Sequence, residues 1–493
     1  MRGFDIFEPL KKQGSEDLDR LLKSNLSIYF IGICGTGMAS LAAMLKSRGH
    51  HVWGSDENVY PPMSTFLADQ QIEVLQGFDE AHLQANRPDL VIVGNAMSRG
   101  NSEVEYVLNE KIAYLSMPAA LGQKFIKDYY SCVVTGTHGK TTTSSILAWI
   151  LESADANPGF FIAGIPENFQ RGFQLGEGRY FVSEGDEYDS AFFDKGPKFL
   201  HYRPDLAIIN NIEFDHADIY NNLEEIKTSF RRMINIIPGN GHIVANADDP
   251  VVTELIAMAY SNVHSFGLSP SATWRAVDLE FGEAGSRFIV LKDGQKYCEL
   301  TTPLFGEYNV RNVLAAFVSA TILEIPLEKI QDGLSSFKGV RRRMTQIADI
   351  NKVLIFEDFA HHATAVRETL KGVRQRFPNR RIVAVFEPRT ASAKRKVFEN
   401  QYYAAFDEAD QIILAPMHMP EKAPASERMS VENIVNALNK KGKTARSFTS
   451  NDAVLNCLAE GTQSKDIVVF MSNGNFDRLP HRLAATLNNT TLK

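Results

Sequence analysis

The segment 131–153, SCVVTGTHGKTTTSSILAWILES, constrains the fold more than any other part of the chain. A short apolar run leads directly into two glycines, a lysine and a row of threonines, and a helical pattern follows. A buried strand that ends in a glycine-rich turn and opens a helix is typical of α/β sheets, in which parallel strands are joined by helical crossovers. The sequence therefore predicts a mainly parallel sheet covered by helices in this part of the chain.

Apolar strands and helical stretches alternate in three successive parts of the chain. The first part has strands beginning at Ser27, ending at Asp56 and ending near Asn95. The pattern restarts at 131 and again after FKGVRRR, so we expect three α/β domains with boundaries near 130 and 338. The later predicted strands are YFVSEG, LAIINN and HIVANADD, then VLIFEDFA, RIVAVFEPR, QIILAP and IVVFMSNG.

Composition excludes several classes of protein. The 493 residues are 44% apolar and 23% charged, as in ordinary globular proteins, and the net charge of −7 gives no basic field for nucleic acid. No apolar run approaches a membrane span, and the N-terminal segment 1–20 lacks the apolar core of a signal peptide. The cysteines form no CxxC pair, which is typical of a reducing compartment. We therefore expect a cytoplasmic protein without a nucleic-acid or membrane partner.

The turn after the strand at 131–135 has the parts of a phosphate-binding loop. Gly136 and Gly139 allow the backbone N–H groups to approach a phosphate closely, Lys140 supplies a cation, and Thr141 supplies a hydroxyl for Mg²⁺. The common pattern G-x-x-x-x-G-K-[ST] is not met, because Val134 stands at its first glycine. The shorter form G-T-H-G-K-T still predicts that the loop holds the terminal phosphates of a nucleoside triphosphate.

Two acidic segments follow predicted strands of the same sheet. SEGDEYDSAFFD places Glu184 after the first strand, and NNIEFDHADIY places Asp215, His216 and Asp218 after the second. Ligands bind at the carboxyl ends of parallel strands, and Mg²⁺ prefers carboxylate oxygens. Each segment alone is equally compatible with a solvated loop, and His216 either binds a metal or caps a helix. Together they favour a metal site.

The first domain opens with GICGTGM, whose glycines are Gly32, Gly35 and Gly37. This spacing does not match the dinucleotide fingerprint G-x-G-x-x-G, which argues against an NAD-dependent oxidoreductase. The turn nevertheless offers N–H groups at a helix N-terminus, which suits a diphosphate. Asp56 ends the next strand, where a hydrogen bond to a nucleotide sugar is plausible.

The motifs TGTHGKTTT, EGDEYD, NNIEFDHAD, GEYNVRNVLAA, GVRRRM and EDFAHHAT occur in the order found in the ATP-dependent Mur ligases, and the chain resembles this family over nearly its whole length. The resemblance implies a Rossmann-like UDP-sugar-binding domain at 1–130, a P-loop ATPase-like ATP-binding domain at 131–338 and a Rossmann-like peptide-binding domain at 339–493. It further implies amide-bond formation on a UDP-muramoyl carboxylate with ATP and Mg²⁺.

Within the family, the segments GSDENVYPPMSTFL, FFDKGPKFLHYRP, FEPRT and MSNGNF are most similar to members that attach a recycled murein tripeptide, L-alanyl-γ-D-glutamyl-meso-diaminopimelate, to UDP-N-acetylmuramate. These members serve peptidoglycan recycling. The alternative is a member that attaches L-alanine to the same nucleotide in de novo synthesis. The oligomeric state, monomer or dimer, stays open.

The resemblance implies roles for individual residues around ATP. Lys140 is expected on the phosphates, and Thr141, Glu184 and His216 on the metal ions. Tyr308 stands where the family usually has histidine, and Phe359 where it has tyrosine. The residues expected to bind ATP are Gly136, Thr137, His138, Gly139, Lys140, Thr141 and Thr142, with Asn309 and Asn312 at the adenine, Arg342 or Arg343 near the nucleotide, and Asp358 near the ribose.

The other substrates are assigned in the same way. The peptide is expected at Arg389, Thr390 and Asn473. The carbamylated lysine of some relatives and the D-N-P-R motif of the diaminopimelate-adding ligase have no counterpart in this sequence. The expected catalytic residues are Lys140, Glu184, His216 and His361, while His361, Asp215 or water deprotonates the incoming amine. The UDP-substrate is expected at Gly35, Thr36, Gly37, Met38, Asp56, Asn95 and Ser98.

Overall fold

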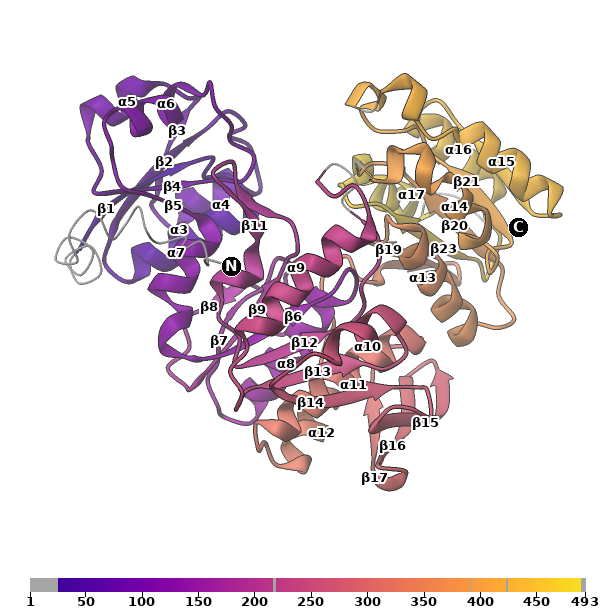
Figure 1. Ribbon diagram of the computed structural model, residues 1–493. Helices are drawn as coiled ribbons and strands as arrows, with labels where there is room; N and C mark the ends of the chain where they lie inside the picture. The colour runs from indigo at the N-terminus through magenta and orange to yellow at the C-terminus, as the bar shows by residue number, and fades with distance from the viewer. Residues whose placement is uncertain (1–24, 216–218, 391, 423, 489–493) are drawn as a thin grey trace. The chain divides into compact units, whose positions relative to one another are not determined.

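The computed structural model describes residues 25–215, 219–390, 392–422 and 424–488 (Figure 1). His216 and Asp218, together with the N-terminal segment, lie outside the described residues. The chain divides into two compact units. The first comprises residues 1–133, 158–163 and 172–205, and the second comprises 134–157, 164–171 and 206–493.

The first unit contains a five-stranded parallel sheet in the order β3-β2-β1-β4-β5. Its central strands β1 and β4 are apolar and buried because helices cover a parallel sheet on both faces. The three strands predicted here are confirmed. The elements are β1 (Ser27–Ile31), α3 (Thr36–Ser47), β2 (His51–Asp56), α4 (Met63–Asp69), β3 (Glu73–Gln76), α5 (Glu80–Ala85), β4 (Leu90–Val93), α6 (Ser102–Asn109), β5 (Tyr114–Ser116) and α7 (Met117–Lys124).

The first unit also holds one side of the central sheet, in the order β6-β9-β7-β8, and a small hairpin of β10 and β11. β6 begins in this unit and its last residues belong to the second. The predicted strand YFVSEG is confirmed as β9. The elements are η1 (Ile126–Asp128), β6 (Tyr130–Thr135), β7 (Gly159–Phe161), β8 (Phe173–Gln174), β9 (Tyr180–Gly185), β10 (Asp189–Ala191), β11 (Asp194–Pro197) and η2 (Lys198–His201).

The second unit continues the central sheet from the end of β6 through β12, β13 and β14, which run parallel. An antiparallel meander of β15, β16 and β17 extends this sheet, and the sequence reasoning did not predict it. The elements are α8 (Lys140–Ser153), β12 (Leu206–Ile209), α9 (Leu223–Ile236), β13 (His242–Asn246), α10 (Pro250–Ile256), β14 (Asn262–Gly267), β15 (Trp274–Gly282), β16 (Gly285–Lys292), β17 (Gln295–Thr302), α11 (Glu307–Ile322) and α12 (Leu327–Ser335).

The second unit also contains a six-stranded sheet in the order β18-β19-β23-β20-β21-β22, parallel except at β18. Apolar clusters lie on both of its faces, as expected for an α/β layer. The elements are β18 (Thr345–Ile350), β19 (Val353–Asp358), α13 (Ala363–Arg376), β20 (Ile382–Phe386), η3 (Ser392–Lys394), η4 (Lys396–Phe398), α14 (Glu399–Ala405), β21 (Gln411–Leu414), η5 (Pro420–Lys422), η6 (Ala425–Glu427), α15 (Val431–Lys440), β22 (Thr444–Ser447), α16 (Asn451–Gly461), β23 (Ile467–Met471), η7 (Phe476–Arg478) and α17 (Leu479–Asn488).

The three mainly parallel sheets confirm the predicted α/β fold class. The domain boundaries near 130 and 338 stay a prediction. Among the described residues, no helix combines the length and the apolar character needed to cross a membrane.

Candidate functional site

The phosphate loop connects β6 to α8 in the second unit. Gly139 precedes the helix in a left-handed conformation, with φ of 84°, and Gly136 has φ of 125°. The Lys140 ammonium donates to the Gly136 carbonyl over 2.7 Å, which folds the lysine back over the loop. The first-turn N–H groups of α8 have no acceptor within the helix, so the loop presents the donors and the cation that a phosphate requires.

Asn211 holds the middle of this loop in place. Its carbonyl accepts the N–H of Thr137 over 3.0 Å, and its side-chain oxygen accepts the N–H of His138 over 2.7 Å. These two N–H groups are thereby engaged in shaping the loop. The donors directed at a phosphate are therefore those at the start of α8, from Lys140 onward.

Asn309 and Asn312 lie on α11, and both are buried. The Asn312 side-chain oxygen accepts the Thr143 hydroxyl over 3.2 Å, and its amide donates to Asn309 over 3.2 Å. Asn309 in turn donates to the Phe305 carbonyl over 3.0 Å. Both residues thus support the phosphate loop and α8 through buried hydrogen bonds. The sequence reasoning did not assign them this role.

Glu184 belongs to the first unit, at the end of β9, and is buried. Its carboxylate accepts the N–H of Ala163 over 2.8 Å. Nearby, the Lys198 ammonium lies 3.0 Å from the Asp186 carboxylate. Burial alone lowers the pKa of Lys198, but Asp186 and other oxygen groups, Glu184 among them, outweigh it and raise the pKa. The expected metal ligand therefore lies in charged, largely buried surroundings rather than in a solvated loop.

The glycine-rich turn of the first unit connects β1 to α3. The Asp56 carboxylate at the end of β2 accepts the N–H of Cys34 and the N–H of Asn58, each over 2.9 Å. Asp56 thus fixes the backbone of the turn. Gly35 and Thr36 are exposed where α3 begins, while Met38 is buried beneath it.

The loop after β4 contains the remaining residues expected at the UDP-substrate. Asn95 and Ser98 are exposed. The Met97 methyl lies 3.3 Å from where a Cβ on Gly32 would be, so this loop and the turn after β1 are neighbours. A Cβ on Gly94, which follows β4, would lie equally close to the Ile31 carbonyl, at 3.2 Å. The structure therefore brings the two predicted parts of the nucleotide-sugar site together at one end of the sheet.

Glu103 is a buried carboxylate of α6 that the sequence reasoning missed. It accepts hydrogen bonds from the Tyr29 hydroxyl over 2.8 Å and from the Ser55 hydroxyl over 2.5 Å, and it lies 2.8 Å from His82 Nδ1. These partners come from β1, β2 and α5. Glu103 therefore ties together the strand ends beneath the turn, including the residue next to Asp56.

Arg342 and Arg343 have different surroundings. The Arg342 guanidinium pairs with Glu357 over 2.7 Å and donates to backbone carbonyls of residues 472–474. The Arg343 guanidinium lies 4.8 Å from the centre of the Phe359 ring. Arg342 therefore acts within the protein fold, which makes Arg343 the better candidate for a nucleotide contact.

Asp358 ends β19 and is buried. Its carboxylate accepts the N–H groups of Met344 and Ala360, each over 2.8 Å. Burial raises the pKa of Asp358, against the opposing charge of Arg343 and these hydrogen bonds. Asp358 thus fixes the segments on both sides of Phe359, where a ribose contact is expected.

His361 and Asp215, both considered for deprotonating the amine, lie close enough to interact. Burial lowers the pKa of His361 to about 4, against the raising effects of the Phe359 carbonyl, 2.8 Å from Nδ1, and of the Asp215 charge. Asp215 is buried and accepts the Ser392 hydroxyl over 2.6 Å. The His361 imidazole is therefore neutral near pH 7, and its lowered pKa makes it a weaker proton acceptor than an exposed histidine.

Arg389 and Asn473, expected at the peptide, follow the neighbouring strands β20 and β23. The Arg389 guanidinium lies against Gly474 and 3.6 Å from the Glu387 carboxylate. The side-chain oxygen of Asn473 is buried and has no hydrogen-bond partner among the described residues. Thr390 instead accepts the N–H of Ala393 over 3.1 Å and shapes the turn that follows. Of the three residues expected at the peptide, Arg389 and Asn473 therefore lie next to the same residue, Gly474.

Comparison with known proteins identifies the family. Three family models match in succession: "Mur ligase family, catalytic domain" at residues 27–130, "Mur ligase middle domain" at 134–320, and "Mur ligase, glutamate ligase domain" at 342–474.

The chain is 38% identical over 460 residues, 93% of its length and 97% of the relative, to the UDP-N-acetylmuramate–L-alanyl-γ-D-glutamyl-meso-2,6-diaminoheptandioate ligase of Escherichia coli K12. It is 31% identical over 92% of its length to the UDP-N-acetylmuramate–L-alanine ligase of Clostridium acetobutylicum, of which it covers 97%. Among solved structures, a murein peptide ligase from Psychrobacter arcticus matches with a TM-score of 0.69 and 34% identity, over 95% of this chain and 100% of that one. The resemblance predicted from the motifs is confirmed: the chain belongs to the Mur ligase family.

Proposed function

We propose that this member of a family of ATP-dependent amide-bond-forming ligases joins L-alanyl-γ-D-glutamyl-meso-diaminopimelate to the muramoyl carboxylate of UDP-N-acetylmuramate in peptidoglycan recycling. The observation that carries the ATP-dependent part is the phosphate loop, with Lys140 folded over a glycine turn at the start of α8. The substrate choice rests on the 38% identity to a relative named for this tripeptide, against 31% for a relative named for L-alanine.

We divide the substrates among the three parts of the chain. Residues 1–130 bind the UDP-sugar at Gly35–Met38, Asp56, Asn95 and Ser98. Residues 131–338 bind ATP through the phosphate loop. Residues 339–493 bind the peptide, with Arg389 and Asn473 as its contacts, because one offers a cation for a carboxylate and the other a buried oxygen for a donor. The guanidinium of Arg343, rather than that of Arg342, faces the nucleotide in this assignment.

The chemistry follows from what an amide bond requires. A carboxylate is a poor electrophile, so the muramoyl carboxylate first attacks the γ-phosphorus of ATP, which displaces ADP and gives an acyl phosphate. Lys140 and the first-turn N–H groups of α8 stabilise the charge that spreads over the phosphoryl oxygens. The peptide amine then attacks the acyl carbon, and phosphate leaves. The neutral imidazole of His361, or the carboxylate of Asp215, accepts the proton of the amine.

The donor set suits Mg²⁺, which prefers hard oxygen ligands. The Thr141 hydroxyl and the Glu184 carboxylate are assigned to it, and His216, outside the described residues, keeps its predicted role as a further ligand. Mg²⁺ bound there would neutralise charge on the nucleotide phosphates. Glu184 is already buried and oriented by the N–H of Ala163, which supports its assignment.

The test is phosphate release from ATP in the presence of UDP-N-acetylmuramate and either the tripeptide or L-alanine. We expect turnover with the tripeptide and none above background with L-alanine. Turnover with L-alanine alone would establish the second candidate function, the first addition to the stem peptide. Thermal stabilisation by UDP-N-acetylmuramate without any amine provides an independent check, and no stabilisation at saturation would overturn both candidates.

A further inference from the structure

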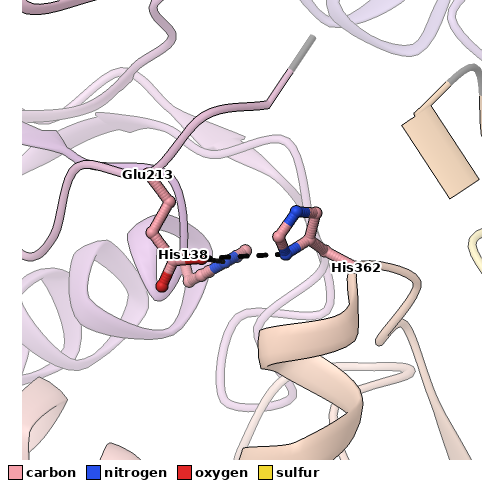
Figure 2. A group of neighbouring side chains, drawn as sticks. All are labelled: His138, Glu213 and His362. Atoms are coloured by element: carbon pink, nitrogen blue, oxygen red, sulfur yellow. Dashed lines mark ion pairs between the residues drawn. The ribbon is translucent and has the colours of Figure 1, made fainter. Parts of the chain in front are cut away.

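Three side chains from separate segments of the second unit converge beside the phosphate loop (Figure 2). His138 belongs to the loop itself, Glu213 follows β12, and His362 precedes α13. Their potential ligand atoms all lie within 4.8 Å of one another. Glu213 Oε2 lies 3.5 Å from His138 Nε2 and 3.8 Å from His362 Nδ1. Two imidazoles and one carboxylate thus surround a single point.

The cluster is shielded from solvent. The His362 side chain is only 4% exposed, against 22% for His138 and 34% for Glu213. The Nε2 atom of His138 is buried and makes no hydrogen bond among the described residues, although it faces Glu213. A buried ring nitrogen without a hydrogen bond is costly unless something else occupies the site.

The cluster combines one carboxylate with two imidazole rings. Two imidazole nitrogens among three ligands favour a zinc-class ion over Mg²⁺, which prefers oxygen ligands.

The backbone around the cluster is held in place. The N–H of Glu213 donates to the Thr137 hydroxyl over 2.9 Å, and the N–H of His138 donates to Asn211 over 2.7 Å. The Thr364 hydroxyl donates to Glu213 Oε2 over 2.8 Å and orients the carboxylate. His362 is the N-cap residue of α13, but its side chain makes no capping hydrogen bond. Each side chain is therefore directed into the cluster by a fixed backbone.

We propose that His138 Nε2, Glu213 Oε2 and His362 Nδ1 bind one divalent transition-metal ion of the zinc class. In a tetrahedral site with bonds of about 2.0–2.2 Å, ligand atoms lie about 3.4 Å apart. The two distances to the carboxylate, 3.5 and 3.8 Å, approach this value, and the three ligand atoms lie within 4.8 Å of one another, so binding of an ion would draw the side chains closer together. Three protein ligands leave one position open.

This site is separate from the magnesium ligands assigned to the ligase reaction. It uses none of Thr141, Glu184 and His216. Its ligands come instead from the phosphate loop, from the segment after β12 and from the residue before α13. A bound ion would therefore connect the phosphate loop of the central sheet with α13 of the six-stranded sheet.

The experiment is a titration of the chelator-treated, full-length protein with Co²⁺ alone, followed by visible absorption, and with Zn²⁺ alone, followed by calorimetry. We expect one equivalent of metal to bind and Co²⁺ to give the intense visible bands of a four-coordinate site. Glu213→Gln and His362→Gln should abolish this equivalent. Thr364→Val, which leaves the ligands in place, should weaken binding by about tenfold.

The matched control is a second pair of neighbouring histidines, His242 and His264, whose ring nitrogens lie 3.1 Å apart on β13 and β14. His264→Gln should leave the equivalent intact. Far-UV circular dichroism and the urea midpoint establish that each variant is folded, and Thr364→Val keeps the test decisive if a ligand variant does not fold. Absence of a stoichiometric site in the unmodified protein, or binding that survives Glu213→Gln, would overturn the proposal.

Discussion

The two glycine-rich turns of this chain follow the same plan and are built differently. Each connects a buried parallel strand to a helix, β1 to α3 in the first unit and β6 to α8 in the second. In the phosphate loop, a Cβ on Gly139 would collide with the Asn312 side chain, and φ is 84°. In the first turn, φ of Gly35 is −62°, and a Cβ would meet Met38 at 3.6 Å and the Gly32 carbonyl at 3.7 Å, both ordinary contacts.

The difference shows where each turn obtains its rigidity. The side chains of Asn210 and Asn312 pack directly against Gly139 and leave no room for anything but glycine. The first turn is instead fixed from the neighbouring strand by Asp56 and from beneath by the Glu103 network. Similar glycine patterns can therefore tolerate substitution very differently, and four experiments test this contrast.

The largest effect is expected at the lysine that only the second turn has. Lys140→Ala should lower kcat by about a thousandfold, because one pre-positioned donor to a developing charge contributes that much. The affinity for UDP-N-acetylmuramate should stay unchanged, since the first turn is intact. Single-turnover phosphate release and calorimetry with the UDP-sugar measure the two quantities. Normal turnover in Lys140→Ala would contradict the assignment of this loop to ATP.

The second-largest effect is expected for Gly139→Ala, which should lower the free energy of unfolding by about 3 kcal/mol. About 1–2 kcal/mol comes from the left-handed backbone, and the contact with Asn312 adds the rest. The matched variant Gly35→Ala should change stability by less than about 1 kcal/mol. Urea unfolding of both variants measures the two losses of stability. Equal losses would contradict the proposed difference between the two turns.

Glu103→Gln should destabilise the first unit by about 2 kcal/mol, because an amide NH₂ replaces an oxygen that accepts buried hydrogen bonds. The control is Glu105→Gln on the same helix, a half-exposed residue paired with Arg99. It should leave the urea midpoint where it is. A midpoint that is also unchanged in Glu103→Gln would show that the turn does not depend on the network beneath it.

The smallest effect is expected at Asp56, which accepts two backbone N–H groups with its two oxygens. Asp56→Asn keeps one acceptor, so the affinity for UDP-N-acetylmuramate should fall by about 1 kcal/mol while ATP binding is unaffected. Asp89→Asn serves as the control, because Asp89 accepts the N–H of Ser27 at the opposite end of β1. Calorimetry with each nucleotide distinguishes the two variants.

The fold followed from the sequence wherever a strand was buried on both faces. β1, β4, β12 and β23 are nearly uninterrupted apolar runs, so their place in a parallel sheet could be predicted directly. The strands of the meander alternate between buried and exposed residues and follow one another closely. This alternation is typical of a half-exposed antiparallel sheet. Because the prediction relied on continuous apolar runs joined by helices, it did not include these strands.

The site was predictable only where chemistry is concentrated in a short segment. The phosphate loop carries its glycines, lysine and threonine within seven residues. Glu103 stands in SEVEYVLN with one other acidic residue, Glu105, and only packing shows which carboxylate is buried. Likewise, Glu213 and His362 are distant in the chain and meet only after folding. The spatial proximity of such residues cannot be inferred from a single sequence.

The meander has a consequence for how the chain behaves among other copies of itself. β17 is the last strand of the central sheet, and an unpaired edge is a template on which further strands can add. Here the Glu299 carbonyl on that edge accepts the Gln331 amide over 3.0 Å, and the Glu299 side chain pairs with Arg287 over 2.6 Å. Lys296 adds an exposed charge on the same strand. The edge is thereby made a poor template for intermolecular β-pairing, which protects the chain from aggregation along its largest sheet.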